Sequence, residues 1–265
     1  MNPPIYVFSA PWAAFLLALA LAAAGLYAIG RRLERRGRQK LLVGAACANL
    51  ACFGLYMYGL VATGLFPAHV IYNMPLQLCS LVTFCLIPAI LVDSRALRGF
   101  CYFIGCLAGF LALFSPATGI EGVGVFSPLS IGFFGSHGLN VVIGALIAGL
   151  GLYRPDYRGA LRTLGYFLAL AAAMAGLNLA LRLTLLPEAN YFYFFDPEGA
   201  DILVALHNLV GLPVIYLLPV VPPLVGVLML QAALYRGGSR LAVRLARSGG
   251  AAGGAPPAPP ALRAS

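Results

Sequence analysis

Charged residues are scarce in this chain. They make up 9% of its 265 residues, whereas 61% are hydrophobic, and the mean hydropathy is +0.91. A soluble domain of this size does not carry so much apolar surface, but a protein that crosses a membrane several times does. The composition therefore excludes a soluble globular domain and predicts an all-α, polytopic helix bundle in a membrane.

Lysine is nearly absent as well. Sixteen of the seventeen basic residues are arginine, and the only lysine is Lys40, in a predicted linker. A retinal photoreceptor needs a lysine in its last span, so that class is excluded. The net charge of +9 does not indicate nucleic-acid binding, because the arginines stand in short blocks between apolar runs, a pattern that orients membrane spans. The expected partners are the bilayer and its phospholipids.

Disulfide and metal patterns are also missing. None of the six cysteines lies in a linker predicted to face outside, so no structural disulfide is expected. No pair of cysteine or histidine residues has the spacing of zinc ligands, and neither a metal nor a cofactor is expected. Five cysteines are interpreted as small packing residues, and only Cys79 lies in the polar layer described below.

The apolar residues form seven runs of about spanning length. The first run has no charge before it and a basic block after it, so we expect a retained span and not a cleaved signal peptide. Several prolines in the last run predict a kinked helix. The membrane domain covers residues 1–236, and the basic Gly/Ala/Pro-rich segment 237–265 is expected to be a disordered cytoplasmic tail. The predicted spans are residues 10–29, 41–64, 74–92, 99–114, 131–152, 163–186 and 204–235.

Basic residues alternate between the linkers. Six lie in the first linker, two in the third, three in the fifth and five from Arg236 onward, while the second, fourth and sixth linkers have none. Basic residues concentrate on the cytoplasmic side of membrane proteins. The alternation therefore predicts seven spans, with the N-terminus outside and the C-terminus in the cytoplasm.

A polar stretch begins the third predicted span. Asn73, Pro75, Cys79 and Ser80 place an amide, a proline, a thiol and a hydroxyl within eight residues. Polar groups in hydrocarbon are costly unless they find partners, so such a stretch indicates function. Cys79 is expected about 7 Å below the outer edge of the span. The alternative is that these residues only begin the helix and pack against neighbours.

Three further spans carry polar groups in the same outer layer. His137 is expected about 9 Å below the outer edge of the fifth span, with Asn140 one turn deeper. Arg182 lies about 6 Å from the outer end of the sixth, with Asn178 one turn beneath, and His207 opens the seventh. Each also has a simpler explanation, since histidine can bond a carbonyl, arginine can reach the headgroups and asparagine can join helices. Their common depth favours a functional site.

Four motifs resemble those of the bacterial YwaF-like family of integral membrane proteins. They are Met74 to Ser80, Ser136-His137-Gly138, Asn190-Tyr191 and Pro197-Glu198-Gly199. That family is similar to the animal transmembrane acyltransferase that transfers polyunsaturated acyl chains onto lyso ether phospholipids. The resemblance covers about residues 40–235 and implies a multi-pass protein of a bacterial cell membrane with a phospholipid substrate.

The resemblance also implies a catalytic pair. Cys79 matches the cysteine of the family's Pro-Leu-His-Leu-Cys motif and is the expected acyl-accepting nucleophile. His137 matches the histidine of its Ser-His-Gly motif and is the expected base. The chain departs from the family at Gln77, where the family usually has histidine. Glutamine donates and accepts hydrogen bonds but does not shuttle a proton near neutral pH, so an active site here would depend on His137 alone as base.

Such a site needs further groups. A buried thiol ionises poorly unless a nearby cation compensates for the desolvation of the thiolate. His137 as imidazolium, or Arg182, can be that cation. Gln77, Asn140 or Asn178 can donate to the oxyanion. Arg182 and His207 are candidates to hold the lipid phosphate.

Three classes of function remain open. The first is a lipid acyltransferase or lipid hydrolase built on Cys79 and His137. The second is a small-solute transporter, although no internal repeat is visible and only Arg182 is charged deep within a span. The third is a non-catalytic membrane protein that organises partners. The aromatic segment 190–195 is interpreted as an interfacial anchor.

Overall fold

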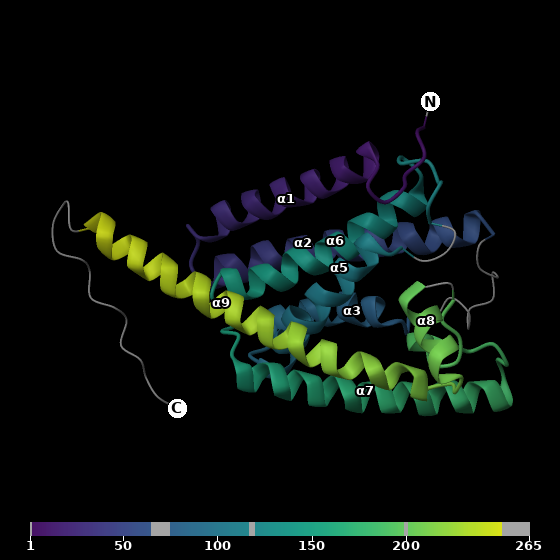
Figure 1. Ribbon diagram of the computed structural model, residues 1–265. Helices are drawn as coiled ribbons and strands as arrows, with labels where there is room; N and C mark the ends of the chain where they lie inside the picture. The colour runs from purple at the N-terminus through teal and green to yellow at the C-terminus, as the bar shows by residue number, and fades with distance from the viewer. Residues whose placement is uncertain (1, 65–74, 117–119, 199–200, 251–265) are drawn as a thin grey trace.

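The computed structural model describes residues 2–64, 75–116, 120–198 and 201–250 (Figure 1). Over these residues every regular element is helical, apart from an isolated β-bridge between Pro4 and Gly124. The all-helical prediction is confirmed. The elements are α1 (Ala10–Gly30), α2 (Arg35–Ala62), α3 (Leu78–Leu91), α4 (Arg95–Phe100), the π-helical turn η1 (Cys101–Gly105), α5 (Cys106–Phe114), α6 (Pro128–Gly149), α7 (Tyr157–Thr184), the 3₁₀ turn η2 (Tyr191–Tyr193), α8 (Asp201–Val210), the 3₁₀ turn η3 (Ile215–Val220) and α9 (Val221–Gly250).

Within the described residues, six helical segments are long and apolar enough to cross a membrane. They are α1, α2, the continuous segment Arg95–Phe114, α6, α7 and Ile215–Leu241. The third predicted span appears only as α3, whose 14 residues reach about 21 Å, short of the roughly 30 Å of a hydrocarbon core. Its predicted start at Met74, with Asn73 before it, lies outside the described residues. A multi-span bundle is therefore supported, and the count of seven stays a prediction.

The seventh predicted span differs from one kinked helix. The chain forms α8, leaves the helix at Gly211 with φ +69°, and passes Val214 at φ +65° before η3 and α9. Proline lacks an N–H and suits the first turn of a helix, and α9 begins with Pro222 and Pro223 in its first turn. The prolines thus separate two helices, and His207 lies on α8.

The expected tail also begins later than the sequence indicated. Helix α9 continues to Gly250, well beyond Gly237. Leucine, alanine and arginine are good helix formers, and they dominate residues 240–247. The remaining residues 251–265 lie outside the described part.

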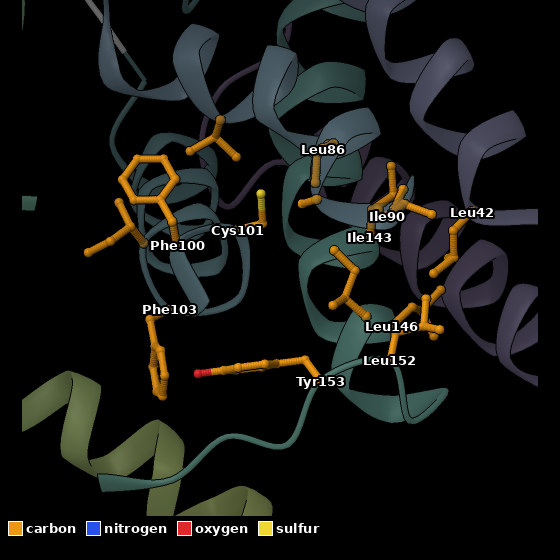
Figure 2. Packing of buried hydrophobic residues seen from close by; sticks show 14 of the residues in the cluster. Leu42, Leu86, Ile90, Phe100, Cys101, Phe103, Ile143, Leu146, Leu152 and Tyr153 are labelled. Carbon is orange, nitrogen blue, oxygen red and sulfur yellow. The ribbon is translucent and has the colours of Figure 1, made fainter. Parts of the chain in front are cut away.

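Helix α6 forms the centre of the bundle. Of its candidate span, 72% is buried, against 6% for α1 and 11% for α7. The main core joins Leu42 of α2 and Leu86 and Ile90 of α3 to Ile143 and Leu146 of α6 (Figure 2). A central helix is surrounded by protein, whereas peripheral helices present their apolar side chains to lipid.

Glycine allows α2 and α6 to approach closely. A Cβ atom added at Gly132 would lie 2.2 Å from the backbone nitrogen of Tyr56, and one at Gly59 would lie 2.6 Å from the Cα of Leu129. No larger side chain fits without moving a backbone. Small residues at contacts are how membrane helices gain packing without a hydrophobic driving force. This contact also presents Tyr56 to the part of α6 that carries His137.

The linkers rich in arginine meet at one end of the bundle, here called the basic end. Their contacts are Arg35 with Asp93 at 3.3 Å, Arg95 with Asp156 at 3.5 Å, and the Arg236 guanidinium 4.9 Å from the ring centroid of Tyr157. Segments that are far apart in the sequence therefore share one end, as the alternation of basic residues requires.

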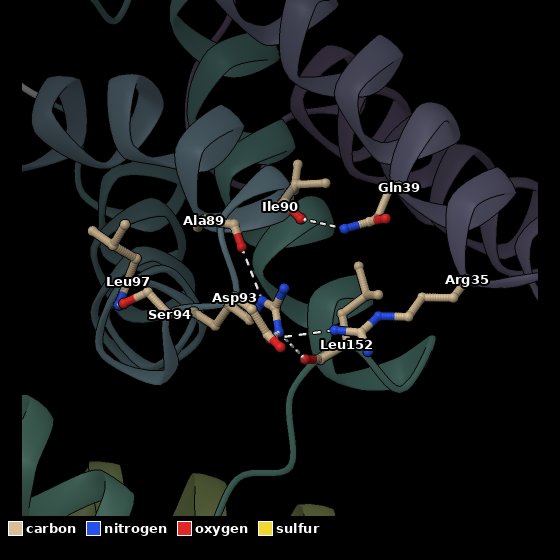
Figure 3. A network of polar contacts seen from close by, with 9 residues as sticks. Arg35, Gln39, Ala89, Ile90, Asp93, Ser94, Leu97 and Leu152 are labelled. Atoms are coloured by element: carbon tan, nitrogen blue, oxygen red, sulfur yellow. Dashed lines mark hydrogen bonds and ion pairs between the residues drawn. The ribbon is translucent and has the colours of Figure 1, made fainter.

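Buried Arg98 ties the end of α3 to the segment after α6 at the basic end. Ala89, Asp93 and Leu152, which it contacts, lie close together there (Figure 3). The Nε of Arg98 donates to the carbonyl of Ala89 at 3.0 Å, and its Nη1 donates to the carbonyl of Leu152 at 2.9 Å and to Asp93. Gln39 likewise donates to the carbonyl of Ile90 at 2.9 Å. The last carbonyls of a helix have no partner within it, so Arg98 and Gln39 supply donors to Ala89 and Ile90 at the end of α3. Arg98 also satisfies the carbonyl of Leu152 in the segment after α6.

The opposite end is closed by the N-terminal segment. The backbone N–H of Ile5 donates to the carbonyl of Val123 at 2.9 Å, and that of Gly122 donates to Ile5 at 2.8 Å. The indole N–H of Trp12 donates to the carbonyl of Leu113 at 2.9 Å. These contacts hold the start of α1 against the segment before α6.

Candidate functional site

Cys79 is the second residue of α3. Gln77 precedes the helix as its N-cap, with no side-chain capping hydrogen bond. The Cys79 thiol is free and half-buried. The first turn of a helix is the positive end of its dipole, which stabilises a negative charge there. Cys79 therefore has one feature of a reactive cysteine.

Asn140 of α6 binds the main chain of Cys79. Its Nδ2 donates to the Cys79 carbonyl at 3.1 Å. Its Oδ1 accepts from Asn49 of α2 at 2.7 Å and from the Thr83 hydroxyl at 3.1 Å. The amide oxygen and one amide N–H of Asn140 are thus engaged, and its expected role as an oxyanion donor stays a prediction.

His137 lies one turn before Asn140 on α6. Its Nδ1 is 2.8 Å from the carbonyl of Phe133, and its ring packs 4.2 Å from the ring centroid of Phe133 and 6.2 Å from that of Tyr56. A carbonyl only accepts hydrogen bonds, so Nδ1 carries the proton. In the neutral imidazole Nε2 then holds the free lone pair, as a general base requires.

No hydrogen bond joins the Cys79 thiol to His137 over the described residues. The connection runs through Asn140, which binds the Cys79 carbonyl. Side chains tilt toward the N-terminus of a helix, so the thiol lies on the N-terminal side of that carbonyl. His137 lies about 4.5 Å nearer the N-terminal end of α6 than Asn140. The thiol and the imidazole are thus at a similar level.

Residues 186–198, here called the cap, fold over this end of the bundle. Asn190 organises them: its Oδ1 accepts from the N–H of Phe195 at 2.8 Å and its Nδ2 donates to Glu198 at 2.8 Å. Gln77 Oε1 accepts from the N–H of Phe192 at 3.0 Å. The cap is therefore fixed to the N-cap residue of α3, two positions before Cys79.

The residues expected in the sixth span also hold the cap. Asn178 accepts from the N–H of Tyr191 at 2.9 Å and donates to its carbonyl at 2.7 Å. Arg182 donates to the carbonyl of Ala189 at 3.1 Å and stacks 4.6 Å from the ring centroid of Phe195. Arg182 is turned inward. The amide oxygen and one amide N–H of Asn178 are engaged by Tyr191, and its expected role as an oxyanion donor stays a prediction.

His207 is more distant from the cysteine. It lies on α8, where its ring meets that of Tyr216 edge-on at 5.0 Å between centroids. The Tyr216 hydroxyl donates to the carbonyl of Tyr193 in the cap. His207 is thus connected to the cap through Tyr216, and its expected role in phosphate binding stays a prediction.

Two residues of the cap extend the site. Burial raises the pKa of the Tyr193 hydroxyl, and the Glu198 carboxylate and the Cys79 thiol raise it further. Burial also raises the pKa of Glu198, against the effect of its hydrogen bond with Asn190. The Tyr193 hydroxyl consequently remains protonated near neutral pH.

Asn49, Thr83, Tyr193 and Glu198 were not among the site residues predicted from the sequence, although Glu198 belongs to one of the four motifs. Asn49 is a lone amide within an apolar run, and Thr83 stands four residues after Cys79, so both patterns were visible. Tyr193 was interpreted as part of an interfacial anchor. No cluster of three or more His, Cys, Asp or Glu side chains suited to a metal occurs in the part of the chain described here.

Comparison with known proteins gives one family. The model of the TMEM164 family matches residues 6–230. No curated protein and no solved structure matches the chain. The expected YwaF-like and bacterial assignments stay predictions, whereas the expected membrane character agrees with the match and with the six apolar helices. Because the match covers most of the chain, this protein belongs to the TMEM164 family.

Proposed function

We propose that this protein is a phospholipid acyltransferase of the membrane, with Cys79 as nucleophile, His137 as base, and its site in the outer half of the bilayer. We further propose the bacterial cell membrane as its location, with seven spans and the N-terminus outside. The observation that carries the proposal is the hydrogen bond from Asn140 to the Cys79 carbonyl, because it joins the first turn of α3 to the face of α6 that bears His137.

The first half-reaction forms a thioester. Nε2 of His137 takes the thiol proton, and the Cys79 sulfur attacks the ester carbonyl of a phospholipid. The ester C–O bond then breaks. The lysophospholipid oxygen takes the proton from His137 and leaves. The acyl chain remains on Cys79.

The second half-reaction transfers the chain. The hydroxyl of an acceptor lysophospholipid gives its proton to His137 and attacks the thioester carbonyl. The C–S bond breaks, and the thiol is restored with the proton from His137. Atoms and charges balance over the two steps without a cofactor.

Gln77 is the best oxyanion donor among the amides predicted from the sequence. Asn140 and Asn178 each donate one amide N–H to a main-chain carbonyl, which fixes the direction of the amide. Gln77 uses its oxygen on Phe192, which leaves its Nε2 group for a developing negative charge. This role does not require the proton transfer that a histidine would provide.

Arg182 is the proposed phosphate ligand. One of its N–H groups binds the Ala189 carbonyl, and Phe195 supports one face of the guanidinium. Guanidinium groups present five donors in a planar fork that matches phosphate. The group can therefore bind a lipid phosphate while it stays in place.

The test is acyl exchange by the purified protein in vesicles that contain a phospholipid with a labelled acyl chain. The wild type should carry a label on Cys79 that hydroxylamine removes. Cys79→Ser should abolish exchange because a hydroxyl is a far weaker nucleophile. His137→Ala should slow thioester formation by on the order of a hundredfold. Cys85→Ser, on the same helix, should exchange normally. Full exchange by folded Cys79→Ser protein would overturn the proposal.

A further inference from the structure

A buried polar network surrounds the main chain of Cys79. It consists of Asn49, Thr83 and Asn140, whose side chains are 0%, 1% and 1% exposed, respectively. The three residues come from α2, α3 and α6, so the network joins the three helices at one point. Below, these three residues are called the cysteine network.

Two of its members act directly on one carbonyl. Asn140 Nδ2 and the Thr83 hydroxyl are each 3.1 Å from the Cys79 oxygen. Asn49 Nδ2 donates to Asn140 Oδ1 at 2.7 Å, which fixes the amide of Asn140 with its N–H groups toward Cys79. Asn49 therefore acts on Cys79 through Asn140.

Stability alone does not account for the cysteine network. Asn49 Oδ1 is buried and has no hydrogen-bond partner over the described residues. An unsatisfied buried acceptor destabilises a fold, and a leucine of similar size would avoid that cost. In addition, the Thr83 hydroxyl has one proton to share between Asn140 and Cys79. A network that is not fully satisfied suggests that it serves another purpose.

The start of α3 needs such support. Its N-cap residue Gln77 makes no side-chain hydrogen bond to the first turn of α3, because its side-chain oxygen accepts from Phe192 in residues 186–198 instead. A helix end without capping frays. Because Cys79 is in the first turn, fraying would move the thiol relative to His137, and a displacement of about 1 Å can cost on the order of a hundredfold in rate.

We propose that Asn49, Thr83 and Asn140 are positioning residues that hold the Cys79 main chain in place for attack on the acyl group. The assignment rests on the proposed acyl transfer for its purpose, whereas the restraint on Cys79 is a property of the fold. The cysteine network does not touch the substrate, and it contributes through the position of the nucleophile.

The experiment compares four variants. Thr83→Val removes the hydroxyl with little change of shape, and Thr83→Ser restores it. Asn140→Leu removes the hydrogen bonds of Asn140 with the Cys79 carbonyl, Asn49 and Thr83. Thr163→Val is the matched control, because Thr163 is equally buried, at 2% exposure, but lies on α7 near the basic end. Each protein is purified in vesicles, and its melting temperature is recorded.

The first measurement is alkylation of individual cysteines by N-ethylmaleimide, followed by mass spectrometry. Thr83→Val and Asn140→Leu should raise the rate at Cys79 about threefold or more, since the freed first turn exposes the thiol. The rate at Cys101, which is fully buried, should not change. Thr83→Ser and Thr163→Val should match the wild type. A general loss of stability would raise both rates together, so it is distinguishable from a local effect.

The second measurement is acyl exchange. Thr83→Val should lower kcat on the order of tenfold and leave KM for the phospholipid unchanged, because positioning affects the reacting atoms and not lipid binding. If Cys79 alkylation and kcat in Thr83→Val both equal the wild-type values, the inference is overturned. If the wild type shows no exchange, the proposed function fails, while the alkylation ratio still decides whether the cysteine network restrains Cys79. An Asn140→Leu protein that does not fold leaves the decision to Thr83→Val.

Discussion

Replacement of Arg98 by methionine tests how the basic end is held together. Arg98 is 3% exposed and donates to two main-chain carbonyls, at Ala89 and Leu152. Methionine fills a similar volume but donates nothing. Each carbonyl would lose its donor, and an unsatisfied buried acceptor costs about 1–3 kcal/mol.

Two effects change the loss of stability expected from the two unsatisfied carbonyls. Removal of a buried guanidinium recovers desolvation free energy, and Nη2 of Arg98 has no partner over the described residues. The ion pair with Asp93 contributes far less than the carbonyl contacts, because the Asp93 side chain is 75% exposed. We therefore expect Arg98→Met to lower the free energy of unfolding by about 2–4 kcal/mol.

The assay is reversible unfolding in mixed micelles, monitored by the fluorescence of Trp12 and by circular dichroism. Arg95→Met is the matched control, since Arg95 lies one turn away on α4 with a side chain that is 70% exposed and an ion pair to Asp156. Arg95→Met and Asp93→Asn should change the free energy little. If either costs as much as Arg98→Met, exposed ion pairs and not the carbonyl bonds hold the basic end, and the reasoning is refuted.

Three further predictions concern the membrane orientation and the cap. An impermeant maleimide added to intact cells should label Phe126→Cys and not Ala96→Cys, because the basic residues predict that Phe126 faces outside; the reverse labelling would invert the orientation. The raised pKa of Glu198 means that the folded state binds its proton more tightly, so the cap should lose stability as the pH rises from the ordinary glutamate pKa through the raised one. Hydrogen exchange of the cap amides, corrected for intrinsic rates, should show this loss in the wild type but not in Glu198→Gln. Gln77→His should keep the cap closed near neutral pH, because neutral imidazole can accept the hydrogen bond from the N–H of Phe192. The same variant should increase acyl exchange if a second base assists the reaction. Unchanged exchange would show that glutamine at position 77 does not limit activity.

The sequence predicted the class of fold well because the relevant forces are local. Apolar runs long enough to span hydrocarbon can be identified directly from the sequence. Over the described residues, six helices of sufficient length coincide with such runs. The prediction that the basic linkers lie at one end of the bundle required only that linkers with and without basic residues alternate along the chain. Cys79 and His137 were selected because a polar side chain within an apolar run is costly to bury in a membrane and therefore indicates a functional role.

Helix ends were less predictable, since they depend on capping and on turns. The prolines near residue 220 were interpreted as a kink, yet they begin a new helix after the left-handed turn at Gly211 and Val214. The arginine-containing tail was expected to be disordered, but its helix formers extend α9 to Gly250. Proline and glycine mark a break in the helix without showing the direction in which the chain continues.

The roles of the polar residues were decided only by the tertiary structure. Gln77, Asn140 and Asn178 have the same side-chain chemistry, so no feature of the sequence distinguished their roles. The fold assigns Gln77 and Asn178 to the main chain of the cap and Asn140 to that of Cys79. An amide takes whichever partner the neighbouring helix presents, and that neighbour is set by packing between distant segments. The sequence by itself determined which groups are costly to bury in a membrane, and the arrangement of the helices determined which partner compensates each of them.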